Sequence, residues 1–416
     1  MIGGIGAATP IPLLAYSKPL LERQKFAAAF SGAMPARVNM RRLERIAPAA
    51  MKAVTVCPSK HSVDIVEVTE PRIAAPTQVK LRMLEVGVCG TDKDICAFAY
   101  GTPPPGSDRF VLGHESLGEV VETGPGVADL RAGDLVVSTV RLACSDANCA
   151  PCRAGHYDFC ATGNYREHGI KDLDGFMTEF VVEDRHNLHP VAPELRDVAV
   201  LVEPLTIAEK ALIEVREIQQ RLHWVGGRQR AVILGSGPVG LLGAMVLVNA
   251  GFETYVYSRS PKPNAKADVA EGVGARYISS AQTPIEQMAE QVGNIDLIYE
   301  AAGAPQFAFE VLKHLGSNGI YVFTGVPRDQ EPVAFDTERI MYNLVLKNQV
   351  VLGVVNAGPQ AFDNAVRDIG VFAARWPQAL RAMITGRYPM EAFHDPVMGA
   401  AGGIKNVIEI SQAGRA

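Results

Sequence analysis

Short apolar runs in which buried-type and polar positions alternate recur through residues 51–200 and predict a domain rich in β-strands. Glycine- and proline-containing turns separate these runs, of which the clearest are residues 51–56, 78–86, 116–123 and 134–139. Successive side chains of a strand point to opposite faces, so each run can bury one face in a core. The long segments between the runs are the expected carriers of functional groups.

The pattern changes near residue 229, where strand-like and helix-like segments begin to alternate. An apolar strand at 230–234 is followed by a helix at 241–249 and a second strand at 251–258. Later segments repeat the pattern, with strands expected at 295–299, 319–325 and 350–355 and a helix at 360–372. Such alternation favours a parallel sheet covered by helices. A final strand at 404–410 is expected to rejoin the first domain.

Length and composition limit the classes of protein to consider. A chain of 416 residues is ample for two domains, and 48% hydrophobic with 20% charged residues is typical of a soluble globular protein. The net charge of −5 gives no reason to expect a nucleic-acid partner. The sequence also contains no uninterrupted apolar segment of the length that spans a membrane.

Residues 1–50 differ from the rest of the chain. They contain seven Lys/Arg and two Glu residues, and no strand pattern appears before the run that starts at Met51. One interpretation is a targeting peptide, because such peptides are rich in arginine and poor in acids. The interpretation that we favour is a disordered tail or an overextended start, because serine is scarce and no cleavage site stands out.

Four of the seven cysteines lie in one short loop, at Cys144, Cys149, Cys152 and Cys160. Such clustering predicts a metal site in a reducing compartment, and therefore a cytoplasmic protein. Four thiolates can close a tetrahedral zinc site, which leaves no coordination position open, so we expect a structural zinc. The alternative is four ordinary small buried residues.

A second candidate metal site combines Cys89, His114 and Glu203. Glu203 stands in the apolar run Leu201–Leu205, where an unpaired carboxylate is unfavourable unless a cation neutralises it. Thiolate, imidazole and carboxylate together can hold a catalytic zinc with one open position. Alone, His114 would be interpreted as a core histidine and Cys89 as a small buried side chain.

Thr91 follows Cys89 by two residues and can place its hydroxyl beside a substrate alcohol, from which it would relay a proton. The alternative is that Thr91 caps the helix expected to begin at Asp92, and both roles are compatible.

The strand at 230–234 runs into a Gly-x-Gly-x-x-Gly turn that precedes a helix. This context predicts a dinucleotide-binding unit, with the expected contacts at Gly235, Gly237, Pro238, Val239 and Gly240. The amides at the start of the helix would then face a pyrophosphate.

Cofactor choice is expected at the end of the second strand, where an acidic residue would favour NAD. Ser258 and Arg259 stand there instead, and Lys262 and Lys266 follow. A hydroxyl and a guanidinium suit a 2′-phosphate, so we expect NADP to be preferred and NAD to remain usable. The alternative is that Arg259 is a solvated loop charge.

From residue 51 onward the chain resembles the zinc-dependent medium-chain dehydrogenases, and within them the glucose dehydrogenase branch first known from archaea. The resemblance rests on the segments Cys89–Asp92, Gly113–Glu115, Tyr157–Cys160, Glu167–Ile170, Asp174–Phe176, Val202–Leu205, Glu209–Lys210 and Val355–Ala357. It implies an α/β fold with a β-rich GroES-like catalytic domain and a Rossmann domain built on a doubly wound parallel sheet. The implied domains are residues 51–228 with 357–416 for the first and 229–356 for the second, after the extension at 1–50.

The resemblance also implies roles for individual residues. Zinc would be held by Cys89, His114 and Glu203, with Glu115 as a further ligand, a water partner or a catalytic group. Sugar hydroxyls would be held by Glu167 and Asn356 in the neighbourhood of Glu115 and Glu203, and Asn356 would also border the cofactor. A homodimer or homotetramer is implied. Three features depart from the family pattern. Ser258-Arg259-Ser260 replaces an Asn-Arg-Arg-like run, Leu346 replaces a sugar-contacting histidine, and the step from Cys144 to Cys149 is two residues longer than in the compact family form.

The expected reaction is zinc-dependent oxidation of an aldose, D-glucose at C1, to the lactone, with hydride transfer to NADP. An alternative on the same scaffold is a polyol, threonine or simple alcohol dehydrogenase. A hypothesis of another class is a non-catalytic NADPH-binding protein.

Overall fold

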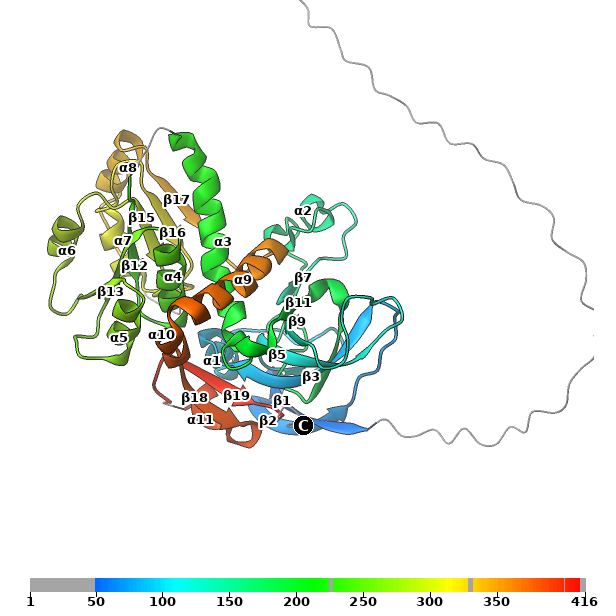
Figure 1. Cartoon of the computed structure of the whole chain (residues 1–416). Helices are drawn as coiled ribbons and strands as arrows, with labels where there is room; N and C mark the ends of the chain where they lie inside the picture. The colour runs from blue at the N-terminus through cyan, green and yellow to red at the C-terminus, as the bar shows by residue number, and fades with distance from the viewer. Residues whose placement is uncertain (1–48, 224–226, 328–331, 400, 412–416) are drawn as a thin grey trace, which may run out of the picture. The chain divides into compact units, whose positions relative to one another are not determined.

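The fold was examined in a computed structural model that describes residues 49–223, 227–327, 332–399 and 401–411 (Figure 1). The predicted extension at residues 1–50 lies almost entirely outside this range. Within it, the predicted division into a β-rich part and an alternating α/β part is confirmed.

The β-rich part is built from one large sheet and two small sheets. The large sheet has the order β11-β6-β5-β3-β19-β18, with β10 paired to β3, and the small sheets have the orders β2-β1-β4 and β7-β8-β9. The strands are β1 (Ala50–Cys57), β2 (Ser62–Thr69), β3 (Gln78–Gly87), β4 (Phe110–Val111), β5 (Glu115–Thr123), β6 (Leu135–Ser138), β7 (Arg141–Leu142), β8 (Arg166–His168), β9 (Asp172–Leu173), β10 (Phe180–Asp184), β11 (Leu188–Val191), β18 (Ile384–Pro389) and β19 (Lys405–Glu409).

The alternating part forms a parallel sheet in the order β14-β13-β12-β15-β16-β17. Its strands are β12 (Arg230–Leu234), β13 (Glu253–Ser258), β14 (Arg276–Ser279), β15 (Leu297–Glu300), β16 (Ile320–Phe323) and β17 (Val350–Gly353). The strand order reverses between β12 and β15, and ligands of doubly wound sheets bind at that switch point. The Gly-x-Gly-x-x-Gly turn leaves β12 at this place.

Helices cover the sheets and connect the two parts of the chain. Those of the alternating part are α4 (Pro238–Asn249), α5 (Ala265–Gly272), α6 (Ile285–Val292), α7 (Pro305–Leu312) and α8 (Thr337–Leu346). The others are α1 (Gly90–Cys96), α2 (Ala150–Arg153), α3 (Val202–Gln219), α9 (Pro359–Arg375), α10 (Pro377–Ala382) and α11 (His394–Val397). The two long helices α3 and α9 pack against each other.

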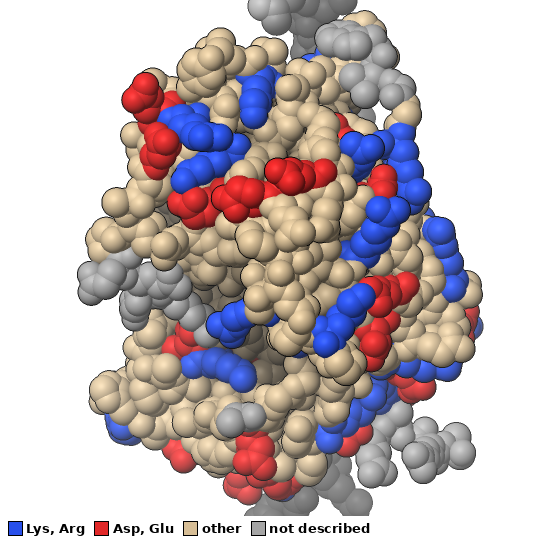
Figure 2. Space-filling view, turned by 90° about the vertical axis from the view of Figure 1, so that its left-hand side faces the viewer, with Lys and Arg blue, Asp and Glu red and all other residues tan. Residues whose placement is uncertain are grey.

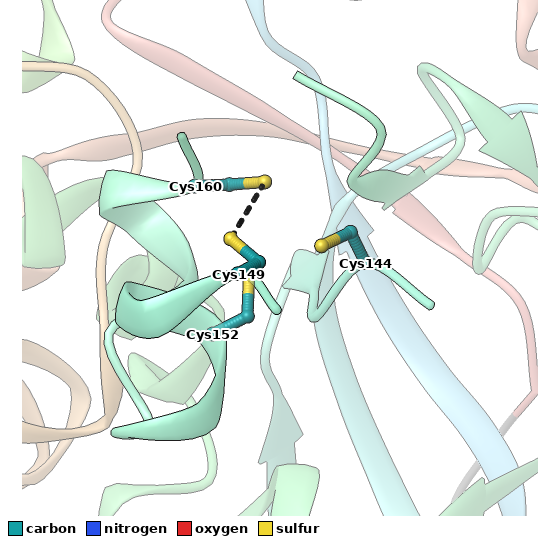
Figure 3. A group of neighbouring side chains, drawn as sticks. All are labelled: Cys144, Cys149, Cys152 and Cys160. Atoms are coloured by element: carbon teal, nitrogen blue, oxygen red, sulfur yellow. Dashed lines mark hydrogen bonds between the residues drawn. The ribbon is translucent and has the colours of Figure 1, made fainter. Parts of the chain in front are cut away.

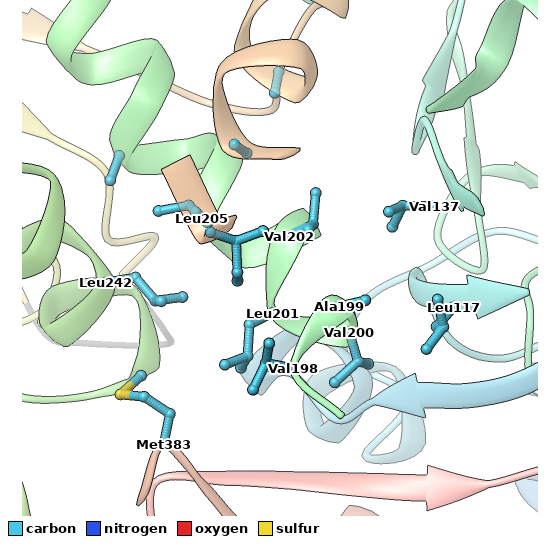
Figure 4. Packing of buried hydrophobic residues seen from close by; sticks show 14 of the residues in the cluster. Leu117, Val137, Val198, Ala199, Val200, Leu201, Val202, Leu205, Leu242 and Met383 are labelled. Carbon is cyan, nitrogen blue, oxygen red and sulfur yellow. The ribbon is translucent and has the colours of Figure 1, made fainter. Parts of the chain in front are cut away.

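An apolar segment that leads into α3 carries a core shared by both parts. Side chains from Val198 to Leu205 pack toward Leu117 and Val137 of the large sheet and toward Leu242 of α4 (Figure 4). The side chains of residues 198–202 and Leu205 belong to one continuous cluster of buried residues with Leu117, Val137 and Leu242. The same segment carries Glu203, so the core fixes the place of that carboxylate.

The predicted strands are confirmed, and their bounds differ by at most two residues from those expected. The helix expected at 241–249 begins earlier, at Pro238, because Gly237 takes the N-cap position and proline fits the first helical turn. The final strand does rejoin the first domain, since β19 pairs antiparallel with β3. None of the helices in the described ranges has the length and apolar character needed to cross a membrane.

Candidate active site

Three metal-ligand side chains meet beside the paired ends of β3 and β5. Cys89 follows β3, His114 precedes β5 and Glu115 is its first residue. Their ligand atoms all lie within 4.8 Å of one another, with His114 and Glu115 buried and Cys89 half-buried. One thiolate, one imidazole and one carboxylate form a donor set that zinc accepts.

Asp92 supports this group from within α1 and was missed as a site residue. Its side chain is fully buried, and Oδ2 accepts a hydrogen bond of 2.7 Å from the backbone N–H of Cys89. Its Oδ1 lies 3.4 Å from Nδ1 of His114. A carboxylate beside one ring nitrogen leaves Nε2 for a metal, an arrangement typical of metal-binding histidines. The residues present therefore fit a zinc ion.

The expectation that Thr91 caps the following helix is wrong. Helix α1 begins at Gly90, its N-cap is Cys89, and Asp92 completes a capping box by accepting from the Cys89 N–H. The acid three residues beyond Cys89 was the signal for this earlier start. The Thr91 hydroxyl oxygen lies 3.8 Å from the sulfur of Cys89, beside the ligand group.

Glu115 has a partner that the sequence pattern did not reveal. Nζ of Lys405 lies 2.6 Å from each oxygen of the Glu115 carboxylate and also donates to the Val88 carbonyl at 3.1 Å. Both side chains are 2% exposed. Burial lowers the pKa of Lys405, but the charge and hydrogen bonds of Glu115 together with the charges of Cys89 and Glu203 outweigh it and raise that pKa above its usual value. Lys405 stands at the start of β19, and nothing in the sequence pattern names the carboxylate that it meets.

Glu203 lies in the first turn of α3 and is 8% exposed. It is outside the set of three residues whose ligand atoms fall within 4.8 Å of one another. Burial raises its pKa to about 7, while the charge of His114 lowers it and that of Glu115 raises it. Glu203 is thus electrostatically coupled to the ligand group.

Glu167 and Asn356, which are distant in the sequence, are in direct contact. Nδ2 of Asn356 donates to Oε1 of Glu167 at 2.7 Å. Glu167 is 4% exposed, and Arg141 of β7 forms an ion pair with the same oxygen. Asn356 has a left-handed backbone with φ of 57°, and its own Oδ1 accepts from the Ala357 N–H at 2.8 Å.

The four cysteines of the loop face one another, as Figure 3 shows. Their sulfur atoms all lie within 4.8 Å of one another, and the sulfurs of Cys149 and Cys160 are 4.0 Å apart. Cys144, Cys152 and Cys160 are half-buried, and α2 lies between the loop's ends. Four converging thiols fit a tetrahedral zinc site. Cys57 and Cys96 are buried outside this loop.

The glycine turn after β12 has the geometry that a bound pyrophosphate requires. Gly235 has a φ of 100°, and a Cβ on Gly240 would lie 2.3 Å from the Gly235 carbonyl oxygen. Nothing lies within 4 Å of the place where a Cβ on Gly237 would be. The turn is tight on one side and open on the other, so a ligand can approach the backbone N–H groups of Val239 and Gly240.

Ser258 ends β13 beside this turn. Its hydroxyl is 2.8 Å from that of Ser236, the residue between the first two glycines of the motif. Arg259 is exposed, and its carbonyl accepts from Ser279 at 3.2 Å. On the face of the molecule drawn in Figure 2, acidic and basic side chains are interspersed, and neither sign of charge covers the whole face.

Comparisons with known proteins agree with this geometry. Residues 75–193 match the family described as alcohol dehydrogenase GroES-like domain, and residues 196–410 match that described as glucose dehydrogenase C-terminus. The chain is 38% identical over 361 residues to a glucose 1-dehydrogenase of Methanocella arvoryzae, which covers 86% of this chain and 99% of the relative. A glucose 1-dehydrogenase of Thermoproteus tenax is also 38% identical, over 86% of this chain and 99% of its own.

A solved structure resembles the fold along most of its length. It is the glucose dehydrogenase of Haloferax mediterranei in complex with NADP, Zn and gluconolactone, with a TM-score of 0.77 and 31% sequence identity. The match covers 87% of this chain and all of the other.

Proposed function

This chain belongs to the glucose dehydrogenase family of the zinc-dependent medium-chain dehydrogenases, and we propose that it oxidises D-glucose at C1 to the lactone with NADP as hydride acceptor. The observation that carries the proposal is the buried group of Cys89, His114 and Glu115, which Asp92 supports. The family's glucose 1-dehydrogenases and the solved complex with NADP, Zn and gluconolactone give the substrate class.

Cys89 and His114 would bind zinc together with Glu203, and Glu115 would be a further ligand or hold a water. Zinc bound there acts as a Lewis acid that polarises the C1 hydroxyl and stabilises the negative charge developing on its oxygen. Asp92 keeps the His114 ring in one orientation. The Thr91 hydroxyl, beside Cys89, is placed to take part in proton removal from the sugar.

Glu167 and Asn356 would hold the other sugar hydroxyls. Their mutual hydrogen bond fixes both side chains before the substrate arrives, which reduces the entropy lost on binding. Glu115 and Glu203 would border the reacting end of the sugar. Such positioning favours hydride transfer from C1 because it holds the reacting carbon in one place.

NADP would bind at the glycine turn, with Gly235, Gly237, Pro238, Val239 and Gly240 at the pyrophosphate. Ser258 and Arg259 would bind the 2′-phosphate, since a hydroxyl and a guanidinium recognise phosphate well. Asn356 would reach the nicotinamide side of the site. NAD is expected to be used less efficiently.

The four loop cysteines, Cys144, Cys149, Cys152 and Cys160, would hold a structural zinc, because four thiolates leave no coordination position for a substrate. Clustered free thiols suit a reducing compartment, and we place the enzyme in the cytoplasm.

A second copy of the chain is the proposed partner of the alternating part. β17 is the last strand of the parallel sheet, and Val351 on it is 38% exposed. On the neighbouring helix α8, Met341, Tyr342, Val345 and Leu346 are 61–68% exposed. An open strand edge beside exposed apolar side chains is typical of a subunit contact, so we expect a dimer or tetramer. Light scattering would test this, and a monomer at micromolar concentration would contradict it.

Initial rates test the proposed reaction directly. Zinc-loaded protein should be assayed on a panel of aldoses, polyols, threonine and simple alcohols, with NAD and NADP compared for each. The highest kcat/KM is expected for D-glucose with NADP. A higher kcat/KM for a polyol or alcohol would replace the proposed substrate. NADPH binding with no turnover of any compound would favour a non-catalytic binding protein.

A further inference from the structure

Arg141 lies at the start of β7, directly before the cysteine loop, and is 5% exposed. Its Nε and Nη2 atoms are each 2.9 Å from Oε1 of Glu167. Its remaining nitrogen, Nη1, donates to the carbonyl of Asp158 at 3.1 Å. The guanidinium lies 3.7 Å from the centre of the Tyr165 ring. Because these contacts restrain the planar guanidinium of Arg141, it restrains the carboxylate of Glu167 in turn.

All the donors that Glu167 finds within the described residues reach the same oxygen. Nε of Arg141 and Nδ2 of Asn356 each donate to Oε1, and Nη2 of Arg141 forms an ion pair with the same oxygen. Oε2 is then left to accept from another donor. Because Oε1 is saturated by protein groups, the carboxylate cannot rotate to follow a misplaced substrate.

A second connection leads from the cysteine loop to Asn356. Nζ of Lys210 forms an ion pair of 2.8 Å with Oδ2 of Asp158 and donates to the carbonyl of Val355 at 3.1 Å. Lys210 is 4% and Asp158 is 8% exposed. Since Val355 directly precedes Asn356, the lysine fixes the backbone that carries the amide.

Asp158 is the residue at which the contacts of Arg141 and of Lys210 meet. Asp158, which lies in the short helical turn Tyr157–Phe159 before Cys160, accepts from Arg141 through its carbonyl and from Lys210 through its carboxylate. Arg141 holds Glu167, and Lys210 holds the backbone beside Asn356. The loop that ends at Cys160 is therefore connected through Arg141 to Glu167 and through Lys210 to the backbone beside Asn356.

We propose that Arg141 is a positioning residue for substrate recognition, and that through Asp158 and Lys210 the cysteine loop sets the geometry of Glu167 and Asn356 toward one sugar hydroxyl. The inference rests on the proposed function, because it needs a sugar in contact with Oε2 of Glu167. It adds a role to a loop that would otherwise only stabilise the fold.

The test combines substitution of Arg141 in the protein with removal of single hydroxyl groups from the sugar. Arg141→Lys keeps the buried positive charge but loses the planar fork, and Arg141→Met removes the charge as well. Zinc-loaded wild type and variants are assayed with NADP on D-glucose and on its 2-deoxy and 3-deoxy analogues. The matched control is Arg387→Lys, because Arg387 also pairs with a buried carboxylate, that of Glu85, at 3.2 Å.

The Arg141→Lys variant is expected to lose about 100-fold in kcat/KM for glucose, mainly through a higher KM, because a small misplacement of a binding group has effects of this size. One deoxy analogue should lose at least about tenfold less in the variant than glucose does, since the hydroxyl that Glu167 holds is already absent. The NADPH dissociation constant and the zinc content should match the wild type. Arg387→Lys should keep its kcat/KM for all three sugars.

The other outcomes separate this inference from the proposed function. If wild type oxidises glucose but the variant loses the same factor on every sugar, Arg141 only supports the fold and the inference is overturned. If Arg141→Lys cannot be obtained folded, Asp158→Asn provides the same cycle through the Lys210 arm and is judged by the same criterion. If the wild type oxidises no aldose, the proposed function fails and this inference fails with it.

Discussion

The two cysteine-containing centres of the molecule are held in opposite ways. Cys89, His114 and Glu115 come from the segments after β3 and at the start of β5, and Asp92 and Lys405 bind to them. The four loop cysteines come from one stretch of 17 residues, Cys144 to Cys160, and three of them are half-buried. The first centre is assembled by the fold, whereas the second brings its own ligands together.

This difference fits two different tasks. A mixed donor set within a buried network can leave a coordination position for a substrate, and its geometry depends on distant residues. A closed set of thiolates needs no such support and can order a loop that has little core of its own. Loss of a ligand should therefore affect turnover in one centre and stability in the other.

The largest expected effect is on turnover at the first centre. His114→Ala or Cys89→Ser should lower kcat for glucose by at least about 1,000-fold, because the substrate oxygen loses its Lewis acid. NADPH binding, measured by fluorescence titration, should stay within about twofold of wild type, since the glycine turn lies in the other part of the chain. His186→Ala is the control, because His186 is exposed and pairs only with Asp184. A parallel loss of NADPH affinity would show that the site is assigned incorrectly.

At the second centre, loss of a cysteine ligand should lower the stability of the folded protein. Cys152→Ser should remove the zinc of the loop and lower the free energy of unfolding by roughly 3 kcal/mol, since metal binding there is coupled to folding. Differential scanning calorimetry and metal analysis measure both quantities. Cys57→Ser is the control, because its sulfur already lies 3.5 Å from the Ser59 hydroxyl and tolerates a polar neighbour. An unchanged melting temperature in Cys152→Ser would contradict a structural zinc.

The sequence predicted the cysteine and histidine residues of these two centres better than the side chains that pair with them. The cysteine loop is local, and Cys89 follows one predicted strand while His114 precedes another, so spacing and alternation were informative. The pairing of Lys405 with Glu115 joins residues 290 positions apart and depends on the register of β19 against β3. Periodicity carries no information about that register.

The same limit explains why the contact of Arg141 with Glu167 was not predicted. Its position after the apolar run of β6 identifies a strand end, but not the carboxylate that it meets. The glycine turn was easier, because the geometry of a strand, a turn and a helix is set within a dozen residues. The start of α1 was misplaced for the opposite reason, since the capping box at Cys89 and Asp92 is a local signal that was overlooked.

A third prediction concerns the nucleotide end of the active site, where neither metal takes part. Arg259→Glu should change the ratio of kcat/KM for NADP to that for NAD by about 100-fold toward NAD, because a carboxylate repels the 2′-phosphate and can hold a ribose diol. Steady-state rates with both cofactors measure the ratio. Arg131→Glu is the charge-matched control, since the Arg131 side chain is 90% exposed. An unchanged ratio in Arg259→Glu would mean that Arg259 is only a solvated charge.

The smallest expected effect is in helix α3, which connects the two centres because it carries both Glu203 and Lys210. On the same helix, burial and then the neighbouring charge of Asp368 raise the pKa of Glu209 to about 8. Glu209 is 2% exposed. An acid whose pKa is raised by folding favours the folded state below its unfolded pKa of about 4.3, and this contribution is lost as the pH rises toward the folded pKa.

Glu209→Gln should therefore leave stability unchanged near pH 5 and raise it by about 1–2 kcal/mol at pH 8, because the amide carries no charge that burial would disfavour. Urea unfolding at a series of pH values measures the difference. Glu217→Gln, an exposed position on the same helix, should show no such pH dependence. A constant offset at every pH would mean that the side chain contributes through packing alone. A difference that grows between pH 5 and pH 8 would instead show that a buried charge, set between the two cysteine-containing centres, limits the stability of the helix that joins them.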